Sequence, residues 1–231
     1  MPENIFKIYP PKKGPSKDGR RGSGLWSEDS PEKRFEHVKR VLDIYYDVDD
    51  DTFFDDLDLA WFLKNAVIGN IYFSEKVVEG IIGGQYWPKE KTNSNIEAVI
   101  LAIIEGNTYA DGSFREELLQ VRKWLGNDYH NGGEPLRFEH VVPAKVYLEE
   151  LKKLYRDTCF FMGADSQRRF EEFRKKVAVC IVTKGQDEDL NDAKLRESMP
   201  DGWIWETGDM FARYNSEKLM ETITIHFGPG K

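Results

Sequence analysis

The sequence has few residues that could cross-link the chain or hold zinc. Its 231 residues include two cysteines, Cys159 and Cys180, and four histidines. The cysteines do not form a Cys-x-x-Cys pair, which excludes a zinc ribbon and indicates a reducing compartment. No apolar run approaches the ~20 residues of a membrane span, and the first residues contain no apolar secretory segment. We therefore expect a cytoplasmic protein that has no membrane partner.

Basic residues are also too few to balance the acidic ones. The 33 Lys and Arg residues face 41 Asp and Glu residues, so the formal net charge is −8, which argues against a nucleic-acid partner. The distribution is uneven, however. Residues 1–27 carry six basic and two acidic residues, residues 137–176 carry ten basic and seven acidic ones, and residues 47–58 carry seven aspartates. The basic segments therefore leave nucleic acid open as a partner, and the acidic run is either a solvated loop or a second metal site.

The order of hydrophobic and turn-forming residues divides the chain into three regions. Residues 1–28 are rich in Pro, Lys, Gly and Ser, which is typical of a flexible arm, here a basic one. Residues 29–126 are predicted to be helical and could supply recognition or a dimer contact. Their helices are expected to begin near Ser30 and then to cover about 57–69, 74–83, 94–105 and 113–125. Residues 127–231 form the third region.

The most informative segment of the third region is Phe138–Pro143, a short apolar strand that contains Glu139 and His140. Val141 and Val142 favour extended backbone, and the following proline ends the strand. Neighbouring side chains of a strand point to opposite faces. The carboxylate and the imidazole can therefore reach one metal ion only if a bulge or twist re-aims one of them. The alternative is that His140 is a hydrogen-bonded structural residue.

A second strand and a helix follow. Val177–Thr183 is a run of mostly β-branched apolar residues, and Lys184–Gly185 indicates a turn. Residues 187–196 then have a helical pattern with acidic residues in the first turn. We expect Val177–Thr183 to pair antiparallel with Arg137–Val142 and the helix to pack across both strands. An alternating segment at 221–227 is expected to be a strand that pairs with them.

The stretch Glu139-His140-Val141-Val142-Pro143 resembles the HNH, or ββα-metal, nuclease family, in which Asp-His is commonly followed by apolar residues and Pro. The resemblance continues at Cys180–Lys184 and the helix after it, and more loosely at Leu195–Trp203 and Ala212–Tyr214. It covers roughly residues 135–215. It implies an α+β fold in which a mostly helical N-terminal part precedes a ββα-metal (HNH-like) nuclease core.

The resemblance implies a metal-dependent DNA endonuclease of restriction or phage type. His140 would act as general base, since the ordinary pKa of histidine suits proton transfer near neutral pH. Mg²⁺ or Mn²⁺ would be held by Glu139 and by Asp187, Glu188 or Asn191, of which Asp187 lies closest to the family spacing. The partner would be double-stranded DNA, with a homodimer left open. The basic residues expected to contact the DNA are Arg137, Lys145, Arg196 and Arg213.

The chain departs from the family pattern in three ways. Glu139 stands where Asp is usual. The 33 residues from Ala144 to Lys176, which have the pattern of two amphipathic helices, form a longer connection than is common. No histidine follows Thr183. These departures define the alternative hypothesis, a non-catalytic nucleic-acid- or protein-binding module that retains a degenerate nuclease fold. A further alternative is a nuclease with paired acids and a lysine, for which the residue types are present at Asp55, Asp56, Asp58 and Lys64.

Overall fold

The computed structural model describes residues 38–39, 42, 63–64, 67–86, 94–106, 121, 124–125, 134–156, 165–216, 219 and 223–228. The predicted basic arm, the acidic run at 47–58 and the loop at 126–133 lie outside these residues. So do Asp55, Asp56 and Asp58 of the paired-acid alternative.

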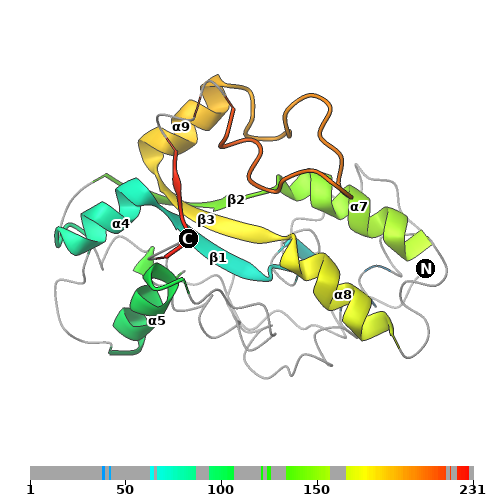
Figure 1. Cartoon of the computed structure of the whole chain (residues 1–231), viewed down its shortest axis with the longest axis horizontal. Coiled ribbons are helices and arrows are strands. Elements are labelled where there is room, and N and C mark those ends of the chain that lie inside the picture. The colour runs from blue at the N-terminus through cyan, green and yellow to red at the C-terminus, as the bar shows by residue number, and fades with distance from the viewer. Residues whose placement is uncertain are drawn as a thin grey trace, which may run out of the picture.

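Within the described residues the fold is α+β, as the sequence predicts, with five helices and four strands whose bounds are defined (Figure 1). In chain order they are β1 (Asn70–Ser74), α4 (Glu75–Ile82), α5 (Ser94–Ile104), β2 (Leu136–His140), α7 (Ala144–Arg156), α8 (Ser166–Lys175), β3 (Ala178–Thr183), α9 (Lys184–Asp192) and β4 (Ile225–His226). Helices α4 and α5 fall in two of the predicted helical segments. Helices α7 and α8 confirm the two helices predicted between the paired strands.

The strands form one mixed sheet in the order β2-β3-β1-β4. Strands β2 and β3 pair antiparallel, with Glu139 opposite Cys180 and His140 opposite Val179, so the predicted pairing is confirmed. Strand β1 runs parallel to β3 and antiparallel to β4. The sheet therefore combines the expected pair with a parallel neighbour that was not expected.

Two sequence-based expectations about this sheet are wrong. The region 29–126 contributes strand β1 as well as helices, and β1 lies between β3 and β4. The last strand is limited to Ile225–His226 and pairs with β1, not with β2 or β3. The parts of regions 29–126 and 127–231 that the structure describes consequently share one sheet.

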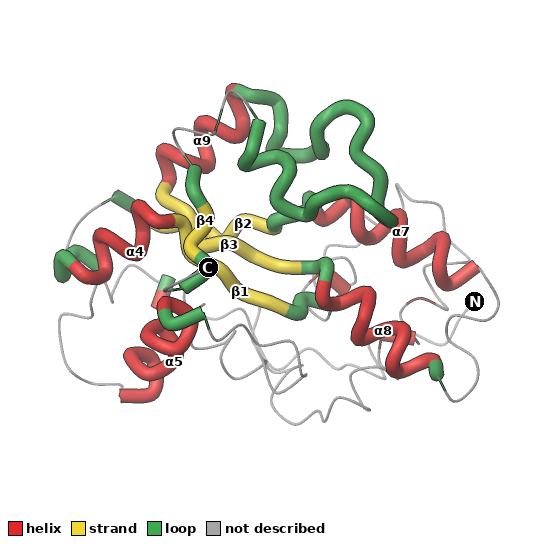
Figure 2. Tube along the Cα trace, viewed as in Figure 1, coloured by secondary structure: helices red, strands yellow, loops and turns green. Residues whose placement is uncertain are grey.

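Figures 1 and 2 show the helices and loops that flank the sheet. Two apolar clusters cover its opposite faces. The first core packs side chains of α4, α5, α7 and α8 against Val179 and Ile181 of β3. The second core packs Leu190 of α9 and Tyr214 of the loop segment 193–216 against Cys180 and Val182. Because alternate β3 side chains enter the two cores, all six residues of this strand are buried.

Helix α9 begins at Lys184, directly after β3, whereas the sequence predicted a turn at Lys184–Gly185. The Thr183 hydroxyl accepts a hydrogen bond from Gln186 N (3.3 Å), and Gln186 Oε1 accepts one from Thr183 N (3.0 Å), which is a capping box. Gln186 Oε1 also accepts from the Ser74 hydroxyl (2.8 Å), which ties α9 to β1. Gly185 N donates to a Glu134 carboxylate oxygen, and a Cβ at this position would lie 2.7 Å from that oxygen, so a larger residue would displace the Glu134 side chain.

Candidate functional site

Strand β2 directs Glu139 and His140 to opposite faces of the sheet. The register with β3 runs without a break from Leu136 to His140, so there is no bulge to re-aim either side chain. Glu139 stands opposite Cys180, whose side chain belongs to the second core, and His140 stands opposite Val179 of the first core. The alternation of the strand therefore keeps the two predicted catalytic side chains apart.

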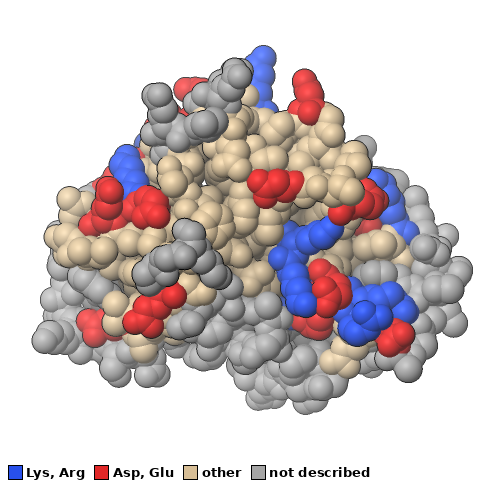
Figure 3. All heavy atoms as spheres, viewed as in Figure 1, with Lys and Arg blue, Asp and Glu red and all other residues tan. Residues whose placement is uncertain are grey.

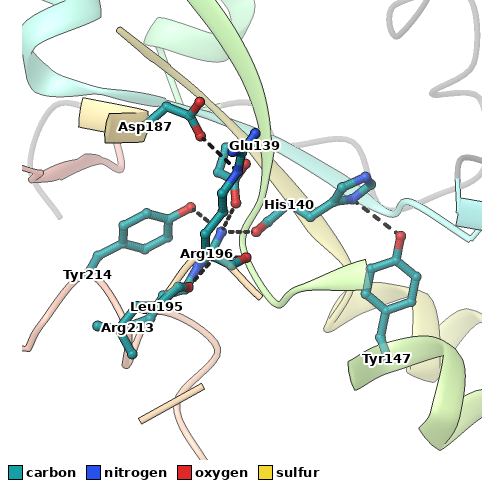
Figure 4. Close-up of polar contacts among 8 residues, drawn as sticks. All are labelled: Glu139, His140, Tyr147, Asp187, Leu195, Arg196, Arg213 and Tyr214. Carbon is teal, nitrogen blue, oxygen red and sulfur yellow. Dashed lines mark hydrogen bonds and ion pairs between the residues drawn. The ribbon is translucent and has the colours of Figure 1, made fainter. Parts of the chain in front are cut away.

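His140 packs on the first-core face against α7 (Figure 4). Its Nδ1 lies 3.3 Å from the Tyr147 hydroxyl, and that hydroxyl donates to the Lys64 carbonyl (3.0 Å). Because the hydroxyl hydrogen is used for the carbonyl, the imidazole Nδ1 must donate to the tyrosine oxygen. The ring is also 5.9 Å from the Phe138 ring. This arrangement is compatible with a structural histidine, the alternative considered for this residue.

Glu139 lies on the opposite face in an ion pair with Arg213, whose Nη2 is 2.5 Å from Glu139 Oε1. Burial raises the pKa of the Glu139 carboxyl above its ordinary value. The Arg213 guanidinium acts in the opposite direction, the Asp187 carboxylate raises the pKa further, and Arg196 lowers it. Two acids and two guanidinium groups thus interact on this face of β2.

Arg213 is fully buried and was predicted to contact DNA, which this position does not allow. Its Nη1 donates to the carbonyls of Leu195 (2.9 Å) and Arg196 (3.2 Å). Its Nη2 donates to Glu139 and also to the His140 carbonyl and the Tyr214 hydroxyl. The guanidinium therefore joins β2 to both ends of the loop that follows α9, and it is a structural cation.

Of the three predicted α9 ligands, Asp187 is the one that lies beside Glu139 (Figure 4). Its side chain is 12% exposed, and Oδ1 is 3.8 Å from Arg196 Nε. Glu188 is 62% exposed and pairs with Lys184 one turn earlier (3.2 Å), and Asn191 is exposed. The first turn of α9 buries Asp187 together with the capping Gln186, whereas Glu188 faces solvent.

The oxygen donors on the second-core face of β2 suit a hard divalent cation, although there are few of them. Mg²⁺ is commonly held by one or two carboxylates with waters and substrate phosphates filling the remaining positions. Glu139 and Asp187 supply two carboxylates, and Arg213 and Arg196 compete with a cation for them. Among the described residues there is no group of three or more His, Cys, Asp or Glu side chains arranged to hold a metal. The pair fits Mg²⁺ or Mn²⁺ only with additional ligands from water or substrate.

The other predicted DNA contacts remain accessible. Arg137 and Lys145 are exposed, and the Arg196 side chain is 54% exposed. Figure 3 shows acidic and basic side chains interspersed on the viewed face, with basic ones gathered where α8 lies in Figure 1. The charge pattern of this face is mixed and does not form a continuous basic track.

A cavity that the sequence did not predict lies beside the end of β2. It has a volume of about 270 Å³ and is lined by Val142, Lys176, Trp203, Trp205, Gly208, Asp209 and Met210. The signal that could have indicated it is the Trp-x-Trp pair within the turn-rich segment 201–208, because aromatic residues on an irregular loop are frequently functional.

Among the described helices, none combines the length and the apolar character that a membrane crossing requires. No protein-family model, curated protein or solved structure matches the chain. The likeness to HNH nucleases accordingly rests on the residues quoted for it.

Proposed function

We propose that the protein is a metal-dependent DNA endonuclease of the HNH type, in which Glu139 and Asp187 hold the ion. One observation carries the proposal: the antiparallel pair β2–β3 is followed directly by α9, whose first turn brings Asp187 to Glu139. This strand–strand–helix order and this pair of acids are what the family resemblance implies.

Bound Mg²⁺ or Mn²⁺ would stabilise the negative charge that develops on the leaving oxygen of a phosphodiester. The chain itself supplies two carboxylates on a rigid strand end and a capped helix start. Arg196 is half exposed and its contact with Asp187 is long (3.8 Å), so it can turn to a phosphate when Asp187 binds a cation. Arg213 stays with Glu139 and fixes the direction of that carboxylate.

A general-base role for His140 requires a change at the end of β2. The imidazole lies on the other face, and Val141 N is bonded to the Ala178 carbonyl (2.8 Å) directly after it. Turning His140 toward Glu139 would break this bond and the contact between the His140 carbonyl and Arg213. The proposal therefore includes a rearrangement of residues 140–141 when DNA binds.

A second candidate function follows from the same two features. Arg213 already neutralises Glu139, and His140 is engaged with Tyr147 on the opposite face. Both features suit a nucleic-acid- or protein-binding module that keeps a degenerate nuclease fold, with a guanidinium as its permanent cation. This candidate requires no rearrangement of β2 and predicts DNA binding without cleavage.

A plasmid-cleavage assay with Mg²⁺, Mn²⁺ or chelator distinguishes the two candidates. We expect the wild-type protein to nick or linearise DNA with metal and to be inactive with chelator. His140→Ala should lower the rate by ~10²–10⁴-fold and leave DNA binding nearly intact, since a general base acts in the chemical step.

The matched variants are Asp187→Asn and Glu188→Gln, one buried beside Glu139 and the other exposed on the next residue. Asp187→Asn should lose activity that excess Mn²⁺ partly restores by mass action, and Glu188→Gln should retain it. Wild-type DNA binding without cleavage would instead support the binding module. Equal losses of cleavage activity in both variants would contradict the role of Asp187 as a metal ligand.

A further inference from the structure

The cavity beside the end of β2 has walls of aromatic and apolar side chains. Val142 lies two residues after His140, Lys176 ends the turn after α8, and Trp203, Trp205 and Met210 come from one loop. Its volume of about 270 Å³ is just below the range of drug-sized ligand pockets. It therefore suits a small planar group and is too small for a base pair.

Its two indole rings are held in place by contacts with each other and with neighbouring residues. Their planes are 84° apart with centroids 6.2 Å apart, and Trp205 stacks on Phe173 at 5.0 Å. Trp203 Nε1 donates to the Asp209 carbonyl (2.8 Å). A Cβ at Gly208 would lie 2.3 Å from the same nitrogen, so only glycine permits this approach. A ligand would thus meet two partly exposed, prearranged rings and would order little of the loop.

The charged side chains that line the cavity, Lys176 and Asp209, suit a ligand in which a planar ring is joined to an anionic group. The Lys176 ammonium lies 5.7 Å from the centre of the Trp205 ring and donates to the carbonyls of Trp205 and Glu206, both at 3.1 Å. Neither of these two partners is an anion. The Asp209 carboxylate accepts from Phe211 N (3.0 Å) and Asn215 Nδ2 (3.1 Å). Its charge is partly satisfied by these donors.

We propose that this cavity binds a single unstacked nucleobase, with the phosphate of the same nucleotide directed toward Lys176. Nucleobases bind proteins by stacking on aromatic rings beside a positive charge, and a nucleotide combines the planar ring with the anion. An aromatic side chain of another protein has the ring but no adjacent charge. The inference rests on the proposed function, because Val142 lies two residues after the proposed general base His140 and belongs to the first core, the face on which that imidazole lies.

Binding is tested in chelator, so that no DNA is cut. The probes are a single-stranded oligonucleotide of abasic sites with one central adenine and the same oligonucleotide without the base. Wild-type protein should bind the adenine probe roughly 5- to 150-fold more tightly, the range expected for one base–aromatic stack. Trp203→Leu should lose this preference, and Trp203→Phe, which keeps a ring, should retain most of it.

The control variant is Ile204→Ala. Ile204 lies between the two tryptophans, is 53% exposed and does not line the cavity, so the preference should be unchanged. Equal wild-type affinity for the two probes would overturn the proposal, and so would a preference that folded Trp203→Leu retains. Base-dependent binding without any metal-dependent cleavage would support the nucleobase site and contradict the proposed endonuclease activity. Cleavage without base-dependent binding would remove the cavity proposal alone.

Discussion

The two faces of the sheet are covered by different kinds of structure. On the first-core face, helices α4, α5, α7 and α8 pack apolar side chains against the strands. On the second-core face, one short helix is joined by part of the irregular segment 193–216, which is anchored by the buried Arg213 (Figures 1 and 4). Trp203 and Trp205 of the same segment pack against the first core. A loop leaves carbonyl groups unpaired that a helix would satisfy internally. The comparison teaches that a loop covering a sheet needs a buried cation for its carbonyl groups, whereas helices satisfy theirs internally. The helical face also holds one fully buried guanidinium, that of Arg174 in α8, which donates to the Ile68 carbonyl (2.8 Å).

The largest effect is expected from Arg213→Met. The change leaves Glu139 buried without its partner and removes the donors for three carbonyls, so unfolding should become easier by about 3–5 kcal/mol. Urea denaturation followed by circular dichroism measures the loss.

Two further variants sharpen this test. Arg196→Ala alters an exposed guanidinium and should cost at most about 1 kcal/mol. Replacing both partners, as in Arg213→Met with Glu139→Leu, should recover part of the loss because no unpaired charge remains buried. Equal effects of Arg213→Met and Arg196→Ala would show that the buried cation does not hold this face together.

On the first-core face, Tyr147→Phe should have a smaller effect. Tyr147 is fully buried, and its hydroxyl donates to the Lys64 carbonyl and contacts His140. Removing it leaves two partly buried polar groups without this partner, which should cost about 0.5–1.5 kcal/mol. The free energy of unfolding in urea, with an unchanged dependence on denaturant, is the measurement. A variant as stable as the wild type would mean that other groups satisfy both atoms.

The smallest effect concerns two carboxylates near α9 whose pKa values shift in opposite directions. Burial raises the pKa of Glu139. Burial also acts to raise the pKa of Glu134, but the Gly185 N–H and the Lys76 ammonium lower it overall. The Glu139 carboxyl therefore stabilises the folded state at pH values below its pKa in the unfolded chain. This contribution is lost as the pH rises through its pKa in the folded protein. The Glu134 carboxyl stabilises the folded state at pH values above its pKa in the unfolded chain, and this contribution is lost as the pH falls through its pKa in the folded protein.

Thermal unfolding from pH 3 to 8 separates the two acids. Glu134→Gln should weaken the loss of stability on acidification, and Glu139→Gln should weaken the loss as pH rises above the usual carboxyl value of 4.5. Glu134 is partly exposed, so its contribution should be the lesser one. Identical pH profiles for wild type and both variants would mean that neither acid is linked to folding.

The sequence predicted the parts of the fold that have strong local patterns. The β-branched run before Thr183 and the apolar strand at Phe138–Pro143 identified the pair β2–β3, and the acidic first turn identified α9. Strand β1 was missed because it has only five residues between two helical patterns, and its partner Ala178 is distant in the chain.

The candidate site was predicted in part for the same reason. Strand alternation indicated that Glu139 and His140 diverge, and the spacing implied by the family resemblance favoured Asp187 over Glu188 and Asn191. The burial of Arg213 could not be predicted, since it depends on β2, α9 and the following loop meeting at one point. An arginine in the sequence gives no sign that its partners are three backbone carbonyls and a carboxylate.

The position of β1 has a consequence for the order in which the protein folds during synthesis. Both neighbours of β1 come much later in the chain, since Asn70 pairs with Ala178 and Phe73 with His226. During synthesis on the ribosome, both edges of this strand stay unpaired until the residues of β3 and β4 have been translated. Such long-range pairing slows folding and leaves apolar strands open to aggregation. We therefore expect β1 to be the segment of the nascent chain that most needs a chaperone.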